Sequence, residues 1–179
     1  LIGFVLGIIL ALMRLGHNKL LHGLAVAYIE FIRGTPLMVQ VMFVYFGIGA
    51  VIQSLPALAA GIIAVSLNSG AYVAEVIRSG IESIAIGQTE AARSLGMSQK
   101  QTYQYVVIPQ AIKNIWPALG NEFITLIKES SIVSVIGVGD LMYQTQLVQS
   151  ATYKGVAPLA ITMVIYFVLT FTLSKGLNY

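Results

Sequence analysis

Residues 34–74, GTPLMVQVMFVYFGIGAVIQSLPALAAGIIAVSLNSGAYVA, carry no charged side chain. A helix crosses the hydrocarbon core of a bilayer with about 20 apolar residues, so this stretch of about 40 is long enough for two crossings. The first crossing is expected to start at Arg33-Gly34-Thr35-Pro36, because proline breaks a helix that precedes it. Gln53-Ser54-Leu55-Pro56 supplies a short turn between the crossings.

The composition of the whole chain agrees with a membrane protein. Of the 179 residues, 57% are hydrophobic and 9% are charged, which is too apolar for an ordinary soluble domain. The chain has no cysteine, so disulfides and thiolate metal sites are excluded, and its net charge of +3 is too small to indicate nucleic-acid binding. The two histidines, His17 and His22, share no helix face, and no metal site is expected.

Three further apolar segments complete the predicted architecture. Residues 155–174 are free of charge and long enough for one span, and residues 115–136 form another span that contains three charged side chains. Residues 1–13 are too short to cross alone and are expected to be the end of a truncated first helix; a signal-peptide core is the alternative, although no cleavage site follows. The sequence therefore predicts an all-α membrane bundle of about five transmembrane helices, with residues 1–179 forming one domain.

Basic residues set the predicted orientation. Lysine and arginine are enriched in cytoplasmic loops of membrane proteins. They gather before the second span, between the third and fourth spans, and at the C-terminal end, which are therefore expected to be cytoplasmic, with the N-terminus outside. These residues are Arg14, Lys19, Arg33, Arg78, Arg93, Lys100, Lys113 and Lys175.

The cytoplasmic loop at about residues 81–113 has a pattern of its own. A short helix is expected after Thr89, because Gly96 supplies the left-handed residue that often ends a helix. Ser98-Gln99-Lys100-Gln101 matches a capping box, so a second helix is expected to run to about Ile108, before Pro109. The alanines leave one side of the first helix open to another protein, while Leu95, Tyr103 and Val106 are expected to hold the two helices together. The pattern alone also fits an amphipathic loop that rests on the membrane.

The same loop resembles a known motif. Glu90-Ala91-Ala92, followed by Gly96 and then Ile108-Pro109, is similar to the EAA loop in the membrane subunits of binding-protein-dependent ABC importers. Other segments resemble, in the same order, the permease family for polar amino acids. They are EFIRGTPLMVQVMFVYFGI (30–48), SLNSGAYVAEVIRSGI (66–81), GQTEAARSLGMS (87–98), VVIPQA (106–111) and NEFITLIKESSIVSVIGVGDL (121–141).

This resemblance implies a function by ATP-driven alternating access in a bacterial inner membrane. The loop would be a coupling helix that sits in a cleft of a separate cytoplasmic ATPase. The implied partners are a dimer of ATP-binding subunits, a second permease subunit (an identical copy or a close homologue) and an external substrate-binding protein. The residues that carry over as ATPase-coupling residues are Glu90, Ala91, Ala92, Arg93, Ser94, Leu95 and Gly96.

The chain itself is not expected to be an enzyme. It lacks the GxxxxGK[ST] loop that cradles phosphates, so ATP and Mg²⁺ are expected on the partner ATPase and no cofactor on this chain. HExxH and GxSxG sequences are also absent, which argues against an intramembrane hydrolase. A secondary transporter or channel for small polar solutes, working alone, is the alternative function.

Polar residues inside the spans are candidates for the translocation path, because such residues usually face the interior of a bundle. A path with both carboxylates and cations suits a zwitterionic amino acid. Structural alternatives are a Glu75–Arg78 ion pair, an Arg78 that reaches the lipid headgroups, and buried ion pairs that join Lys128 and Glu129 to another helix or to another subunit. The path candidates are Asn68, Tyr72, Glu75, Arg78, Glu122, Lys128 and Glu129.

Overall fold

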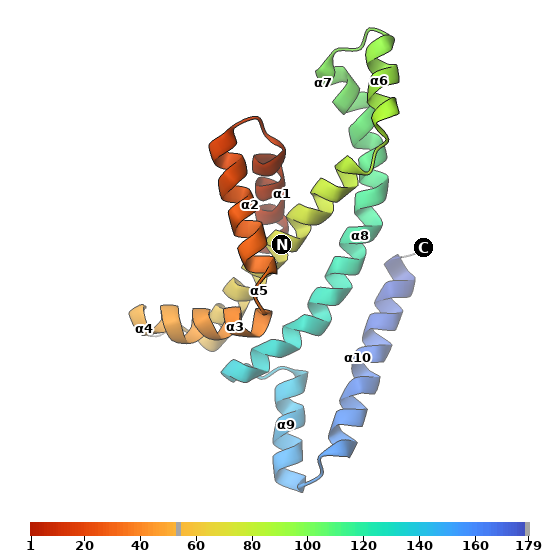
Figure 1. Ribbon diagram of the computed structural model, residues 1–179. Helices are drawn as coiled ribbons and strands as arrows, with labels where there is room; N and C mark the ends of the chain where they lie inside the picture. Colours follow the sequence, from red (N-terminus) through yellow and green to blue (C-terminus); the bar gives the residue numbers. More distant parts are fainter. Residues whose placement is uncertain (53–54, 178–179) are drawn as a thin grey trace.

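The computed structural model describes residues 1–52 and 55–177, and this part of the chain is helical without any strand (Figure 1). The predicted all-α fold is therefore confirmed. The α-helices are α1 (Ile2–Leu15), α2 (Lys19–Arg33), α3 (Leu37–Met42), α4 (Gly49–Val51), α5 (Ala57–Glu82), α6 (Ile86–Ser94), α7 (Gln99–Thr102), α8 (Ile108–Glu129), α9 (Leu141–Thr152) and α10 (Val156–Leu177). Two π-helical segments, η1 (Phe43–Ile48) and η2 (Tyr103–Val107), and a 3₁₀ segment, η3 (Ser130–Ile136), join some of them.

Among the described helices, α5 and α10 are each long and apolar enough to cross a membrane. A third candidate span is broken: α2 and the helical segment Leu37–Val51 meet at a bend of 103°. A helix does begin after Pro36, as predicted, but the residues before the bend form helix α2 rather than a loop. Pro36 explains the bend, since proline offers no N–H and forces the preceding residue out of helical geometry. Of the predicted turn at residues 53–56, positions 53 and 54 lie outside the described residues.

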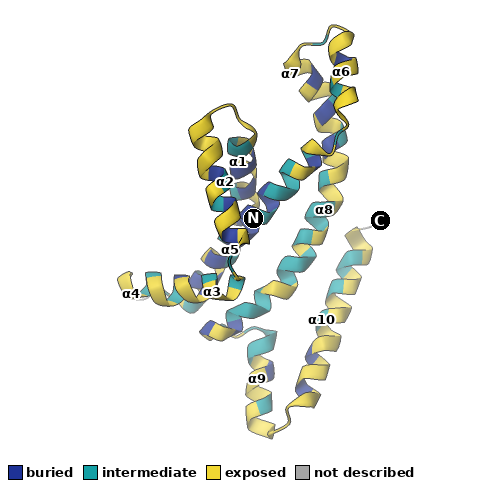
Figure 2. Ribbon diagram, in the orientation of Figure 1, coloured by how far each residue is buried: buried dark blue, intermediate teal, exposed yellow. Residues whose placement is uncertain are grey.

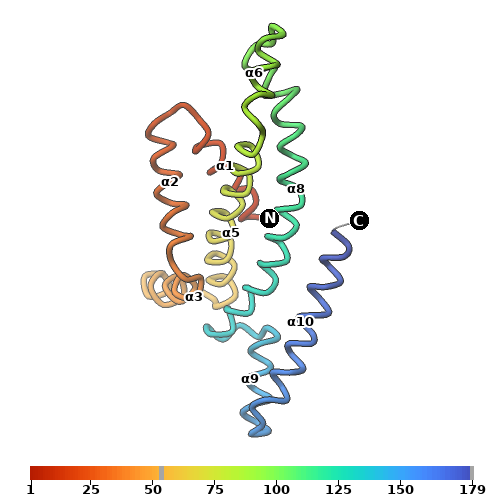
Figure 3. The backbone as a smooth tube through the Cα atoms, turned by 45° about the vertical axis from the view of Figure 1, so that its right-hand side comes forward, coloured from red at the N-terminus to blue at the C-terminus, as the bar shows by residue number. Residues whose placement is uncertain are grey.

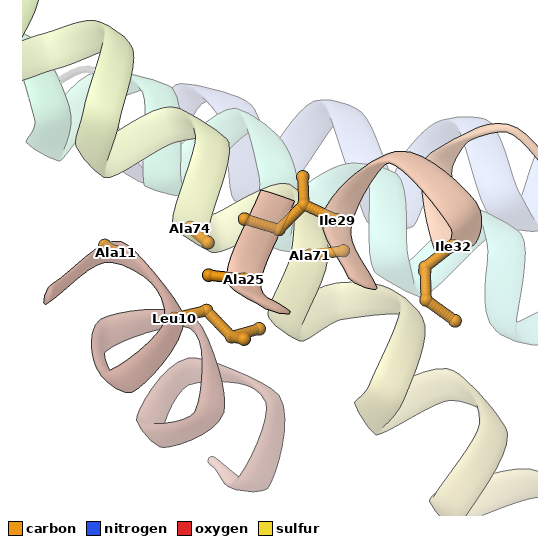
Figure 4. Packing of buried hydrophobic residues seen from close by; sticks show 7 residues of the cluster. All are labelled: Leu10, Ala11, Ala25, Ile29, Ile32, Ala71 and Ala74. Atoms are coloured by element: carbon orange, nitrogen blue, oxygen red, sulfur yellow. The ribbon is translucent and has the colours of Figure 1, made fainter. Parts of the chain in front are cut away.

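Helices α1 and α2 form an antiparallel hairpin that packs on the middle of α5 (Figures 1 and 4). The cluster between these three helices is made of small and aliphatic side chains. Its buried members are Leu10, Ala11, Ala25, Ile29, Ile32, Ala71 and Ala74. A second cluster, formed by Val41, Val44, Ala60, Ala64 and Ile136, packs the segment after the bend against the start of α5 and against η3.

Helix α1 approaches α5 closely because glycines face the contact. A β-carbon added at Gly7 would lie 2.5 Å from a methyl carbon of Val73, and one added at Gly3 would lie 2.9 Å from the carbonyl oxygen of Ser66. The spacing Gly3-x-x-x-Gly7 is the small-residue pattern that lets membrane helices come into backbone contact. On α5, the side chain of Leu6 occupies the space that a β-carbon at Gly70 would need.

Helix α8 runs along the molecule from α7 to η3 (Figures 1 and 3). The prediction that a helix ends at Pro109 is wrong, since the chain continues as helix through that proline into α8. The π-helical turn η2 explains this: Ile108 N donates to Tyr103 O, five residues back, so the chain is wider where the proline ring would otherwise meet a carbonyl. The segment predicted as the fourth span, 115–136, thus lies in a helix that begins earlier and ends in 3₁₀ turns, and α8 is not among the described helices that are apolar enough to cross a membrane.

Helices α9 and α10 form a second hairpin at the end opposite α6 (Figure 3). The hydroxyl groups of Thr145 and Thr162 lie 2.5 Å apart and hydrogen-bond these two helices. Most of α10 is exposed (Figure 2), including large apolar side chains such as Met163 and Phe167. An apolar helix with so little covered surface is suited to contact with lipid or with another membrane subunit.

The close contact between α1 and α5 makes a testable prediction. Gly7→Val places methyl groups where Val73 already lies, and we expect a loss of about 1–3 kcal/mol in the free energy of unfolding. Gly23→Ala is the control, because a β-carbon at that exposed helical position meets nothing within 4 Å, and alanine favours helix. Thermal unfolding in detergent micelles measures both; equal melting temperatures for the two variants would contradict the packing described here.

Candidate functional site

Glu75, in the second half of α5, is the centre of a charged network. One of its carboxylate oxygens accepts hydrogen bonds from Arg14 Nη1 at 2.8 Å and from Arg78 Nε at 3.1 Å, and Arg33 Nη1 lies 3.6 Å from the same oxygen. Arg78 also pairs with the other oxygen of Glu75 and with Glu82. We call these five residues the Glu75 network.

The network joins three helices, since Arg14 lies in the last turn of α1, Arg33 ends α2 and the other members belong to α5. The Glu75 side chain is 19% exposed. A carboxylate removed from water in this way needs opposite charge close by, and the arginines supply it. The predicted Glu75–Arg78 pair is therefore present, but as one part of a larger network that includes two arginines expected in a cytoplasmic loop.

Tyr72 and Asn68 continue the polar face of α5 as predicted. The guanidinium carbon of Arg33 lies 5.5 Å from the centre of the Tyr72 ring, which is a cation–π arrangement. Asn68 is buried and its Nδ2 donates to Gln40 Oε1 at 3.0 Å. Sequence reasoning did not single out Gln40, although an amide in an otherwise apolar run is the kind of signal that it used for Asn68.

Gln40 also ties the bend between α2 and α3. Its Nε2 lies 2.7 Å from the carbonyl oxygen of Ile32 and 2.8 Å from the hydroxyl of Thr35, which itself donates to Phe31 O. The break at Pro36 frees carbonyl groups at the end of α2, and these side chains satisfy them. The bend is therefore fixed by hydrogen bonds to α5 through Gln40 and Asn68.

The predicted residues of α8 are only partly brought to this site. Glu122 is half-buried, and within residues 1–52 and 55–177 no ion pair joins it to a basic residue. Lys128 is exposed near the far end of α8, where it lines a cavity of about 380 Å³ together with Met142 and Tyr166. Lys128 and Glu129 are both exposed, and across residues 1–52 and 55–177 no ion pair joins either of them to another helix, so the predicted buried pair between helices of this chain is wrong. An ion pair with a second subunit stays a prediction.

The second part of the site is the bracket, by which we mean residues 86–107. Its first helix, α6, ends at a left-handed Gly96 (φ 84°), and Met97 N donates to Ala92 O across the turn. Ser98 and Gln101 form the predicted capping box at the start of α7. The helix–turn–helix form of the loop is therefore confirmed, although α6 begins at Ile86 and not after Thr89.

The side chains of the bracket are arranged differently from the prediction. Ala92 is buried inside the bracket with Thr102 and Val107, because it faces the second helix. Leu95 is 85% exposed and so does not hold the two helices together. Most of the remaining residues of the motif point outward: Glu90, Ala91, Arg93, Ser94 and Gly96 are exposed.

The bracket is hydrogen-bonded to the helix that follows it. Gln110 Nε2 donates to Gln88 Oε1 at 3.3 Å, and one turn further along α8 Asn114 Nδ2 donates to Ser83 Oγ at 2.9 Å. Just below, Gly80 of α5 lies so close to α8 that an added β-carbon would be 2.2 Å from Ile115 Cγ1. The end of α5, the start of α6 and the first half of α8 are thus held as a unit.

Comparison with known proteins decides the family. Residues 3–178 match the family described as binding-protein-dependent transport system inner membrane component. The chain belongs to this family. Permease subunits of this kind are not themselves enzymes. In the described part of the chain, no three His, Cys, Asp or Glu side chains come together in a way that could hold a metal ion.

Individual relatives of the permease cover nearly its whole length. It is 43% identical over 176 residues to the probable glutamine ABC transporter permease protein GlnM of Bacillus subtilis, covering 98% of this chain and 82% of that protein. It is 44% identical over 175 residues to the arginine transport system permease protein ArtQ of Bacillus subtilis, with coverage of 97% and 80%. A crystal structure of an amino acid ABC transporter with histidines superposes with a TM-score of 0.93 at 52% identity, covering 99% of this chain and 83% of that one.

The Glu75 network makes a prediction about stability. Glu75→Ala leaves three arginines around an empty position, and we expect a loss of about 3 kcal/mol in the free energy of unfolding, as for other partly buried pairs from which one partner is removed. Glu82→Ala is the matched control, because its side chain is 54% exposed and its pair with Arg78 is worth about 1 kcal/mol or less. Unfolding of the purified permease in mixed micelles compares the two. Equal losses would show that Glu75 has no central role.

Proposed function

We propose that this chain is the transmembrane permease subunit of an ATP-driven importer of polar amino acids, and that it forms the translocation path by alternating access. The observation that carries the proposal is the bracket: a capped helical turn in which Glu90 and Ala91 of the EAA sequence are exposed, hydrogen-bonded to α8 through Gln88 and Gln110. Family membership and relatives that are named for glutamine and arginine transport support the substrate class.

The assembly that follows from this proposal has four kinds of component. Residues 1–179 form one transmembrane domain, paired with a second permease subunit that is an identical copy or a close homologue. A cytoplasmic dimer of ATP-binding subunits binds ATP and Mg²⁺, and an external protein delivers the amino acid. In a bacterial inner membrane, the bracket and the C-terminus lie on the cytoplasmic side and the N-terminus lies outside.

The exposed surface of the bracket is the proposed contact with the ATPase. Glu90 offers a charge there, and Leu95 and Ile86 offer apolar side chains that are 85% and 76% exposed. Exposed apolar groups next to charged ones are typical of a protein interface. Ala91, Arg93, Ser94 and Gly96 complete this surface, while the buried Ala92 contributes by holding the bracket in shape.

The polar face of α5 and the charged residues of α8 are the proposed path. In this region α2, α5 and α8 carry polar groups inside apolar helices, and the proposed path residues here are Asn68, Tyr72, Glu75, Arg78 and Glu122. Lys128 and Glu129 lie further along α8. A secondary transporter would also need such residues. A secondary transporter would not need a bracket whose turn is exposed while its other end is hydrogen-bonded to α8. This difference favours the importer.

The coupling role of the bracket is tested by reversing one charge. Glu90→Lys is expected to abolish ATP-driven uptake of labelled amino acids into proteoliposomes that contain the permease, its ATPase and its binding protein, because the charge lies on the proposed contact surface. Glu30→Lys makes the same change in charge at an exposed position of α2, away from the bracket, and should leave uptake within about twofold of wild type. Uptake that survives Glu90→Lys and is indifferent to ATP would favour a stand-alone transporter.

The hydrogen bond between Asn114 and Ser83, next to the bracket, makes a separate prediction. Asn114→Ala removes the hydrogen bond to Ser83, so movement of the bracket should be transmitted less completely to α5 and α8. We expect fewer amino acids transported per ATP hydrolysed, while ATPase activity persists. Ser83→Ala should have the same effect, and the double variant should be no worse than either single one, because the two residues share one interaction. Additive losses would show that the residues act independently.

A further inference from the structure

A cleft of about 580 Å³ lies between the turn that joins α1 to α2 and the second helix of the bracket, α7. Both elements lie toward the same end of the molecule, the upper end in Figure 1. Leu15 and His17 line the cleft from the α1–α2 hairpin, and Gln99, Lys100 and Tyr103 line it from the bracket. The cleft thus separates a hairpin that packs on α5 from a bracket that is hydrogen-bonded to α8.

The cleft offers positive charge and hydrogen-bond donors. Lys100 contributes an ammonium group, and Gln99 and Tyr103 contribute an amide and a hydroxyl group that can donate. His17 contributes an imidazole, which can donate a hydrogen bond even when it is neutral. These side chains are exposed, and within residues 1–52 and 55–177 no acidic side chain pairs with Lys100. The cleft can therefore accept an anion.

Neither segment that lines the cleft contains an acid. The first acidic residue of the chain is Glu30, and none occurs between Glu90 and Glu122. On the hairpin side, Lys19 adds a second positive charge two positions after His17. A surface with charge of one sign attracts anions, and the oxygen atoms of a phosphate group accept from ammonium, hydroxyl and N–H donors together.

An apolar stripe on α1 leads away from the cleft. Its exposed side chains recur at intervals of three or four residues, which places them on one face of the helix. They are Val5, Ile8, Leu12 and Leu15. Because Leu15 also lines the cleft, the stripe begins where the polar side chains end. Tyr103, on the other side of the cleft, is 45% exposed, and tyrosine is enriched where a membrane meets water.

The stripe decides between the possible anions. A phospholipid has a charged phosphate group next to acyl chains, so it can use the cleft and the stripe at once. A free phosphate ion or an acidic loop of another protein could use the polar cleft but would leave the exposed leucines of α1 without a partner.

We propose that the cleft binds the phosphate group of an anionic phospholipid, with Lys100 as the main cationic contact and an acyl chain along the α1 stripe. On the proposed orientation, this lipid belongs to the cytoplasmic leaflet. The inference goes beyond the proposed function, because the ligand is not transported. A headgroup held there connects the hairpin to the bracket by a route separate from the Ser83–Asn114 hydrogen bond.

The test measures lipid binding directly. The permease in complex with its ATPase is titrated in detergent with phosphatidylglycerol and with phosphatidylcholine, and the lipids that stay bound are counted by native mass spectrometry. Wild type should prefer phosphatidylglycerol, and Lys100→Gln should lower this preference about fivefold, the effect of one basic residue near anionic headgroups. Lys100→Arg keeps the charge and should keep the preference. A matched control is Lys154→Gln, which removes the same charge from the exposed turn between α9 and α10 and should change little.

Three results would overturn the proposal. The first is a wild-type preference for phosphatidylglycerol in Lys100→Gln. The second is displacement of phosphatidylglycerol from wild type by millimolar inorganic phosphate, which would show a site for a free anion with no role for the α1 stripe. The third is release of the ATPase from Lys100→Gln in phosphatidylcholine alone, which would show that Lys100 contacts the ATPase and not a lipid. None of these results depends on which solute the permease transports.

Discussion

A carboxylate inside a long apolar helix imposes a constraint on everything packed around it. Glu75 lies on α5 between apolar turns, where an unpaired charge costs several kcal/mol. The chain meets this constraint with arginines near the C-terminal ends of α1 and α2. These two helix ends lie at opposite ends of the hairpin (Figure 1). These ion pairs help to hold the hairpin, and with it the bend that follows α2, against α5.

The small residues of the contact make this arrangement possible. Between membrane helices there is little hydrophobic driving force, so association depends on close packing and on polar contacts. Gly3 and Gly7 let α1 approach the backbone of α5, and this approach allows Arg14 to reach Glu75 at 2.8 Å. Packing and charge thus depend on each other: a bulkier α1 would hold Arg14 away from the carboxylate.

Features that depend on residues close together in the sequence could be predicted, whereas features that depend on contacts between distant residues could not. The capping box at Ser98 and the left-handed Gly96 depend on residues a few positions apart, so both were predictable. The roles of Arg14 and Arg33 depend on Glu75, which is up to 61 positions away along the chain. Counting basic residues assigned both arginines to a cytoplasmic loop, because that rule considers charges without their tertiary partners. The continuation of the helix through Pro109 was not predicted either. Proline usually ends a helix because its ring clashes with a preceding carbonyl group, and the π-helical turn before Pro109 removes this clash.

The Glu75 network and the bracket are connected through the contacts that hold α5 and α8 together next to the bracket. Ser83–Asn114 and Gly80–Ile115 hold α5 and α8 together near the bracket, so these helices move as one there. Arg33 is carried by α2, which packs on α5, and Glu122 lies two turns beyond Asn114 on α8. When two helices are held at one end, a rotation about that end changes their separation more with increasing distance from it. A small displacement of the bracket therefore changes the spacing between the far parts of α5 and α8 more than it disturbs the part next to the bracket, where Ser83 and Asn114 hold the two helices together.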